Sequence, residues 1–192
     1  MFTGNRGCLL NDRGELVRHH NGNLWISCLT EYRDWQHPLD EPRTWTPLFF
    51  LDEAVALAAG HRPCGLCRRD DYKAYRDAIT CAVAAPDPVK ADELNRRLAQ
   101  ERLQRGRGLD RAADKILWDS DIGSLPVGSM IWDTDRKESM LVQAECLRPF
   151  DFGGWGDPVF RPSSGRVEVL TPKTSVAALS FGYAARLHPS AE

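Results

Sequence analysis

The sequence predicts an α+β fold, with a mixed N-terminal part and a small β-rich C-terminal part that carries a terminal helix. The chain has 192 residues, of which 42% are hydrophobic and 27% charged, values typical of a globular protein. Short apolar runs rich in strand-forming residues lie near both ends of the chain. Helix start and stop signals are concentrated in the middle and return close to the C-terminus.

The first fifty residues are predicted to form β structure with irregular connections. Residues 24–29 are a short apolar run that follows the turn signal at residues 21–23, which favours a strand. Asp52 is a suitable N-cap for a short helix over residues 53–59, and Gly60 is a typical stop directly after it. The order predicted for this part is therefore strand, loop and short helix.

Two further helices are predicted in the middle of the chain. Asp70 is a suitable N-cap for residues 71–84, and a charged helix over residues 89–105 ends before Gly106. In the first of these helices Cys81 lies opposite the apolar face, so we exclude it from any shared site. That apolar face, which we expect to pack, consists of Tyr72, Tyr75, Ile79, Ala82 and Val83.

After Gly123 the pattern returns to β structure. Residues 129–134 and 139–146 predict a hairpin, and residues 167–170 predict a further strand. Thr171 followed by Pro172 begins a last helix, by the rule that proline is favoured in the first helical turn. We expect an N-terminal module over 1–85, a charged helical connector over 86–122 and a β-rich part over 123–192.

Composition excludes several classes of protein. The formal net charge is −2, so any attraction to nucleic acid has to come from local patches. The sequence has no apolar run of membrane-spanning length and no signal-peptide pattern at its start, which predicts a cytoplasmic protein. In a reducing compartment, clustered thiols are metal ligands or reactive groups before they are disulfides. The six cysteines are at positions 8, 28, 64, 67, 81 and 146.

Cys64 and Cys67 have the spacing of a zinc knuckle. Two cysteines separated by two residues bind one ion, and a helix that starts just after them directs its positive end toward the thiolates. A redox pair of the thioredoxin kind sits between a strand and a helix, whereas this pair follows a helix stop and Arg62-Pro63. The pattern therefore predicts zinc as the cofactor.

The stretch Leu-Asp-Glu-Ala-Val-Ala-Leu-Ala-Ala-Gly-His-Arg-Pro-Cys-Gly-Leu-Cys-Arg, residues 51–68, resembles the metal-binding domain of the Ada type. The resemblance covers roughly residues 49–72. That domain is the N-terminal zinc module of a bacterial protein that repairs methylated DNA. The whole chain also resembles a group of bacterial proteins with the same motif, which share the ends at residues 3–7 and 188–190. This second resemblance implies no activity.

The resemblance to the Ada-type domain implies four cysteine ligands, two of them in an upstream Cys-x-x-x-Cys pair, one of which accepts a methyl group from a DNA phosphotriester. Cys28 matches one of these, but Leu24 and Tyr32 stand where its partner belongs. We predict that Cys28 is the third ligand and that His37, in a loop nine residues later, is the fourth. The alternatives for the fourth position are His61, His19, His20 and Cys8.

Three functions follow. The first is a zinc protein that associates with nucleic acid in DNA repair or processing, in which Arg62, Arg68 and Arg69 bind phosphate. Residues 94–115 support it with seven basic against three acidic residues. The second is a small hydrolase-type zinc enzyme with Glu31, Asp34 or His37 as general base. The third is a purely structural zinc in an interaction protein.

Overall fold

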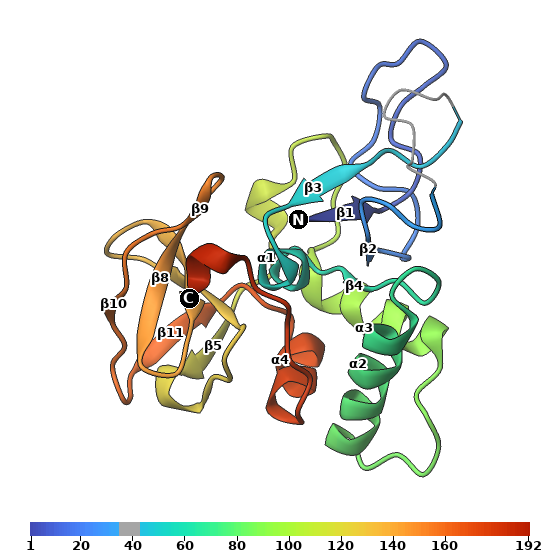
Figure 1. Cartoon of the computed structure of the whole chain (residues 1–192). Helices are drawn as coiled ribbons and strands as arrows, with labels where there is room; N and C mark the ends of the chain where they lie inside the picture. Colours follow the sequence, from blue (N-terminus) through green and yellow to red (C-terminus); the bar gives the residue numbers. More distant parts are fainter. Residues whose placement is uncertain (35–42) are drawn as a thin grey trace.

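A computed structural model describes residues 1–34 and 43–192 of the chain (Figure 1). The fold is α+β, with two sheets and four α-helices within these residues. The smaller sheet holds the N-terminal strands and the larger sheet the C-terminal strands, and the helices lie between and beside them (Figure 1). No helix in the part of the chain that the structure describes is both long and apolar enough to cross a membrane.

The small sheet has the order β3-β1-β2-β4. β1 (Phe2–Asn5) is central and pairs antiparallel with β2 (Ile26–Cys28) and with β3 (Leu48–Phe50). β4 (Arg62–Pro63) is only two residues long and runs parallel to β2. This short parallel pair brings the segment after the first helix to the edge of the sheet.

The first helix follows its predicted start and stop signals closely. α1 (Glu53–Ala58) begins at Asp52, whose carboxylate accepts a hydrogen bond from the Val55 amide at 3.1 Å, and ends before Gly60, whose φ is +82°. Such a left-handed conformation is easily adopted by glycine, which has no Cβ. α2 (Arg69–Ala82) and α3 (Ala91–Arg102) follow.

The large sheet has the order β10-β8-β7-β6-β11-β5, and β9 pairs with β8 outside this path. The predicted hairpin is confirmed as β6 (Met130–Asp133) and β7 (Glu138–Val142), and β11 (Arg166–Val169) is the strand predicted before the last helix. The remaining strands are β5 (Trp118–Asp121), β8 (Cys146–Asp151), β9 (Gly154–Trp155) and β10 (Val159–Phe160). α4 (Lys173–Ser180) is the last α-helix.

Three local predictions were wrong. Asp70 does not cap α2, which begins one residue earlier after Arg68 and has no side-chain cap. Thr171 does not cap α4; its hydroxyl instead accepts a hydrogen bond from the Met130 amide at 2.8 Å. Cys146 begins β8 rather than ending the preceding strand. The Thr171 hydroxyl is used in a tertiary contact instead of a cap. The other two differences concern where an element begins or ends, which sequence signals define least well.

The hydrophobic core consists of clusters that draw on distant parts of the chain. One cluster packs α1, α2 and α3 against α4, with Tyr75 and Tyr183 in edge-to-face contact at 5.3 Å between ring centroids. A second fills the large sheet, and a third joins α1 to β6, β7 and the C-terminal tail. Residues from all three predicted segments therefore contribute to these core clusters. The predicted domain boundaries at residues 85 and 122 stay predictions.

A buried polar network ties α1 to the segment that follows Cys67. The Arg68 guanidinium donates to the Glu53 carboxylate at 2.6 Å and to the Ser27 hydroxyl at 2.8 Å, and both charged side chains are fully buried. Tyr183 also donates its hydroxyl proton to Glu53, at 2.5 Å. A buried ion pair needs such additional hydrogen bonds to offset desolvation, so this network holds the start of α2 rigidly against the small sheet.

Candidate metal centre

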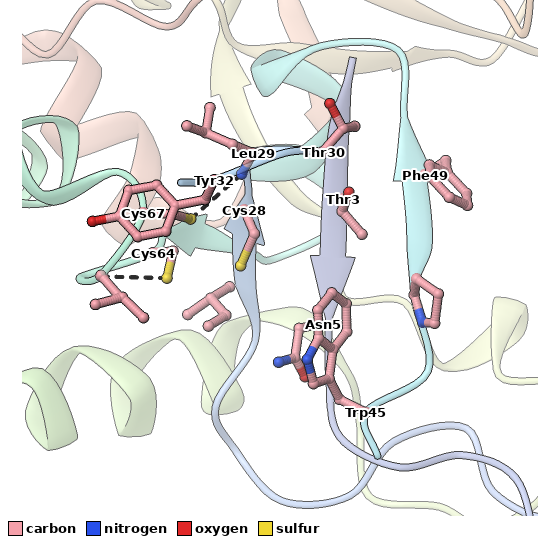
Figure 2. A pocket seen from close by; sticks show the side chains of 13 residues that line it. Thr3, Asn5, Cys28, Leu29, Thr30, Tyr32, Trp45, Phe49, Cys64 and Cys67 are labelled. Atoms are coloured by element: carbon pink, nitrogen blue, oxygen red, sulfur yellow. Dashed lines mark hydrogen bonds between the residues drawn. The ribbon is translucent and has the colours of Figure 1, made fainter. Parts of the chain in front are cut away.

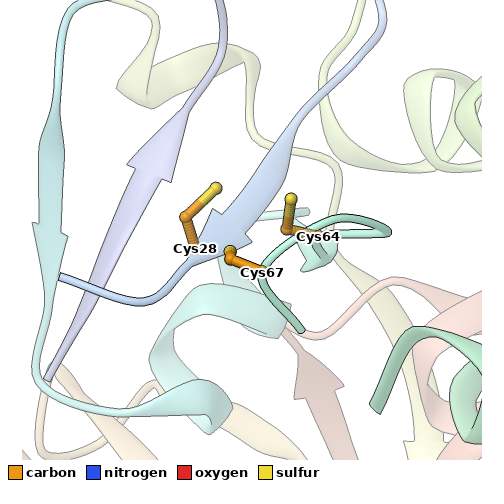
Figure 3. Close-up of side chains that lie close together, drawn as sticks. All are labelled: Cys28, Cys64 and Cys67. Carbon is orange, nitrogen blue, oxygen red and sulfur yellow. The ribbon is translucent and has the colours of Figure 1, made fainter. Parts of the chain in front are cut away.

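Cys28, Cys64 and Cys67 lie together at the edge of the small sheet (Figure 3). Their three sulfur atoms are within 4.8 Å of one another. Three sulfurs that hold one zinc ion at Zn–S distances of about 2.3 Å are roughly 3.8 Å apart. Small side-chain rotations are therefore enough to convert the observed cluster into a metal site, and the donor set fits a soft divalent cation.

The parallel pairing of β2 and β4 explains why Cys28 meets the knuckle. Ile26 is in register with Arg62 and Ser27 with Pro63, so the next residue of each strand, Cys28 and Cys64, continues the same register. The Cys64 amide donates to the Ser27 carbonyl at 3.0 Å, which extends this pairing. Residues in register point to the same face of a sheet, so both sulfurs reach one point.

A tight turn brings the third sulfur to that point. The Arg68 amide donates to the Cys64 carbonyl at 3.2 Å, which closes the turn that carries Cys67. The Leu66 amide donates to the Cys64 sulfur and the Leu29 amide to the Cys67 sulfur, each at 3.4 Å. Backbone donors to sulfur stabilise the thiolate form that binds metal.

Cys28 and Cys64 have pKa values that are shifted in opposite directions. The hydrogen bonds that Cys28 and Cys67 make to its sulfur hold the pKa of Cys64 far below the usual value for a thiol. The hydrogen bonds of Cys28 to Cys64 and Cys67, together with burial, raise the pKa of Cys28. Three adjacent thiolates would repel one another, so the metal-free cluster retains protons. A bound cation takes the place of these protons and offsets the repulsion.

A largely apolar cavity of about 510 Å³ opens directly beside the three sulfurs (Figure 2). All three cysteines line it. Polar side chains reach it from Thr3, Asn5 and Thr30. The apolar walls are Ile26, Leu29, Tyr32, Trp45, Pro47, Phe49 and Leu66. We call this cavity the sulfur pocket; a pocket of this size and lining is suited to a small, mostly apolar ligand.

The structure places most alternatives for a fourth ligand elsewhere. Among the described residues, the ligand atoms of His19, His20, His61 and Cys8 do not join the three sulfurs. His19 and His20 contact each other through their Nδ1 atoms at 3.1 Å, and the Cys8 thiol donates to the Leu10 carbonyl at 3.3 Å. His37 lies outside the described residues, and its role stays a prediction.

His61 is a packing residue within a layer of aromatic rings. Its ring centroid lies 5.2 Å from that of Trp25 and 4.8 Å from that of Phe50, and the side chain is 1% exposed. Burial keeps the pKa of His61 well below its usual value, and the nearby Arg6 adds to this effect. The imidazole is therefore neutral, and its position is that of a core side chain.

Two of the three arginines predicted to bind phosphate are occupied inside the protein. Arg62 is buried, donates to Asn95 at 2.9 Å and stacks over the Tyr72 ring. Arg68 is held by Glu53, as described above. Arg69 is exposed. Arg68 is neutralised by Glu53, and Arg62 does not line the sulfur pocket. We therefore do not propose these two residues as phosphate ligands at the metal centre.

Two of the three candidate general bases lie outside the sulfur pocket, and the third, His37, is not among the described residues. Glu31 and Asp34 are exposed and do not line the sulfur pocket. Cys81 is exposed on α2 and Cys146 lies in the large sheet, so neither contributes a thiol.

The sequence did not predict the sulfur pocket. The one feature of the sequence that relates to it is the alternation of side chains along β1 and β2, which places Thr3, Asn5, Ile26 and Cys28 on its wall.

Comparison of the chain with family models, with curated proteins and with solved structures found no match. The functional argument therefore depends on the geometry of the cysteines and their surroundings.

Proposed function

We propose that the protein binds zinc through Cys28, Cys64 and Cys67. We further propose that it is a small zinc-dependent enzyme that binds a neutral ligand in the sulfur pocket. One observation carries the proposal: the three sulfurs line the same apolar cavity. A structural zinc has four protein ligands and is closed, whereas a catalytic zinc has three and an accessible fourth position. Within the described residues, three sulfurs on a cavity wall match the second arrangement.

The identity of the metal is proposed from the donor set. Thiolates select zinc, copper(I) or iron–sulfur clusters over magnesium and calcium, and a spacing of two residues between cysteines is common in zinc sites. The backbone amides of Leu29 and Leu66 already donate to two of the sulfurs. These donors orient the thiolates for a single ion.

The charge of the centre indicates which ligands fit. Three thiolates around one divalent cation leave one net negative charge, so phosphate and other anions are disfavoured at this face. The cavity walls are apolar, with Asn5, Thr3 and Thr30 as the polar exceptions. When bound, zinc supplies a polarising cation at the open position. The chain supplies a largely apolar pocket and three cysteine sulfurs, with hydroxyl and amide groups to align a neutral ligand.

A metal assay with thiol variants tests the first part of the proposal. We expect one zinc per chain in the purified protein, measured by mass spectrometry of the metal. Cys28→Ser, Cys64→Ser and Cys67→Ser each reduce the zinc content strongly. Cys81→Ser is the matched control, because Cys81 is exposed and lies outside the cluster. Equal zinc content in the wild type and all three cluster variants rules out the site.

Cobalt(II) substitution tests the accessible position. We expect a tetrahedral cobalt spectrum whose visible bands shift when imidazole or a small thiol is added. Leu66→Trp, at an exposed side chain on the pocket rim, should retain the metal but weaken that shift, whereas Leu66→Ala should not. A spectrum that responds to added ligand only in His37→Ala shows that His37 closes the site, and overturns the catalytic proposal in favour of a structural zinc.

A further inference from the structure

A second cavity lies on the other side of the small sheet. It has a volume of about 370 Å³, and most of its polar lining is basic. Asp110 is the one carboxylate among the described lining residues, and it accepts a hydrogen bond from the Ala112 amide at 3.0 Å. The cavity shares no lining residue with the sulfur pocket among the described residues. We call it the basic pocket and define it by Arg6, His19, Trp25, Arg102, Arg111 and Lys115. Ile26 and Cys28 of β2 line the sulfur pocket, whereas Trp25, the residue directly before β2, lines the basic pocket, as alternation of side chains along an extended chain predicts.

The cations of the basic pocket are bound mainly to neutral groups. Arg102 is buried and donates to the carbonyls of Gly60 and Asn23, at 3.2 and 2.8 Å. Lys115 donates to the Ala58 carbonyl at 2.7 Å. Carbonyls satisfy the donors but do not neutralise their charge. Within the described part of the chain, neither Arg102 nor Lys115 forms an ion pair with a carboxylate.

Arg6 adds a third unneutralised charge. One of its terminal nitrogens lies 3.1 Å from the Nε2 atom of His19, and its Nε atom is buried with no hydrogen-bond partner among the described residues. The guanidinium carbons of Arg6 and Arg102 lie 5.2 and 3.9 Å from the centre of the Trp25 ring. Arg111, by contrast, pairs with Asp114.

Arginine and lysine are rarely buried without a counter-charge, because desolvating a charge costs free energy that a partner has to offset. Here the buried Arg102 and the half-buried Arg6 and Lys115 are gathered around one cavity. Their partners are carbonyls, an imidazole and an indole. We propose that this basic pocket binds a phosphate group, which supplies the missing negative charge and accepts hydrogen bonds from Arg6, Arg102 and Lys115.

The electrostatics of the pocket agree with this assignment. Burial lowers the pKa of Lys115 to about 8, and the nearby Arg102 adds to the effect. Burial likewise lowers the pKa of Arg102 to about 9, with a further contribution from Arg6. The cations are thus held in an environment that disfavours their charged forms. A bound phosphate reverses this, since hydrogen bonds between charged groups are roughly twice as strong as neutral ones.

A phosphate group in this pocket has two possible sources, a small phosphate compound or a nucleic acid. A neighbouring cavity shares Arg102 and Arg111 with the basic pocket and adds His20 and Arg105 to the wall. The exposed Arg105 and Arg107 follow α3 on the same segment. This continuation favours neither source by itself, so the experiment has an arm for each.

The test is a binding titration with the zinc-loaded full-length protein. In the first arm, inorganic phosphate and pyrophosphate are titrated by calorimetry; in the second, short single- and double-stranded DNA are titrated at low and moderate salt. We expect binding in at least one arm. Lys115→Gln and Arg6→Gln should each weaken it at least about 10-fold, the size of one charge-assisted hydrogen bond. Lys137→Gln, an equal charge change on an exposed hairpin turn, should leave it unchanged.

The outcomes separate the sources. Saturable phosphate binding that DNA does not displace assigns the site to a small phosphate compound. DNA binding that falls with salt and is lost in Lys115→Gln assigns it to nucleic acid. No binding in either arm, or equal loss in Lys115→Gln and Lys137→Gln, overturns the proposal. The zinc assays described above use different residues, so failure of one proposal does not affect the other.

Discussion

The two faces of the small sheet differ in chemistry although one strand serves both. On one face Cys28 contributes a sulfur to a soft, electron-rich cluster beside an apolar cavity. On the other, Trp25 lies under the guanidinium groups of Arg6 and Arg102 in a cavity lined by cations. The first face suits a metal cation and neutral ligands, and the second suits an anion. Strand alternation is enough to separate two incompatible electrostatic environments by the thickness of one sheet.

The arginines show the same contrast at the level of single residues. Arg68 is buried with a full set of partners, the carboxylates of Glu53 and Asp71 and the hydroxyl of Ser27. Arg102 is equally buried but has carbonyl partners and an aromatic ring. A charge whose partners neutralise it is structural, whereas a buried charge that has no counter-ion and lines a cavity, as Arg102 does, is a candidate binding group.

The largest effect is expected from the sulfur face. Cys64→Ser, or removal of metal with a chelator, should lower the free energy of unfolding by several kcal/mol. The binding free energy of zinc in finger peptides, about 10–16 kcal/mol, is the upper bound. Chemical denaturation with and without chelator measures this. Cys81→Ser is the control, and stability that does not change with chelator in the wild type contradicts the prediction.

A second large effect is expected at the paired arginine. Arg68→Met leaves the Glu53 carboxylate buried without its cation and should lower the free energy of unfolding by roughly 3–5 kcal/mol. The double variant Arg68→Met with Glu53→Gln should recover part of this loss. Urea denaturation of the single and double variants measures the coupling. A loss below about 1 kcal/mol in the single variant indicates that water, rather than the fold, solvates Glu53.

A smaller, pH-dependent effect is expected in the basic pocket. The folded-state pKa of Lys115, about 8, is below its ordinary value of 10.5, so the folded protein binds fewer protons than the unfolded chain between these values. Stability therefore rises with pH across this window, by roughly 1–3 kcal/mol. The groups around Lys115 that titrate or carry charge are Arg6, His19, Arg102, Asp110 and Arg111.

Lys115→Met isolates this effect from the other groups that titrate in the same range. The free energy of unfolding of this variant should lack the rise. The wild type should therefore become more stable relative to the variant as the pH increases from 8 to 10. Thermal denaturation at closely spaced pH values measures it. A constant difference across the window shows that Lys115 titrates normally in the folded protein.

The smallest effect on stability is expected at the unpaired arginine. Arg102→Met removes a buried charge that has no counter-ion, and the gain from avoiding desolvation offsets the lost hydrogen bonds to Gly60 and Asn23. The free energy of unfolding should change by about 1 kcal/mol or less. Urea denaturation compared directly with Arg68→Met measures this. A loss as large as that of Arg68→Met makes Arg102 a structural residue and removes the contrast between the two arginines.

The sequence alone determined the local parts of the metal centre. The spacing of Cys64 and Cys67 is a property of consecutive residues, and so are the cap at Asp52 and the stop at Gly60. Tyr75 and Ile79 on the predicted apolar face of α2 are buried, as helical periodicity predicts, whereas Val83 lies beyond the end of the helix and is exposed. These features depend on interactions within a few residues of the chain, which is why sequence patterns capture them.

The tertiary structure decided which distant residues meet and which charges are free. The two-residue strand β4 has no signal of its own, yet its register with β2 places Cys28 beside Cys64. Arg62, Arg68 and Arg102 have the same composition signal as an exposed basic patch, but all three are buried. Burial and pairing depend on contacts between segments far apart in the chain. A count of charges cannot distinguish a solvated arginine from one that the fold has enclosed.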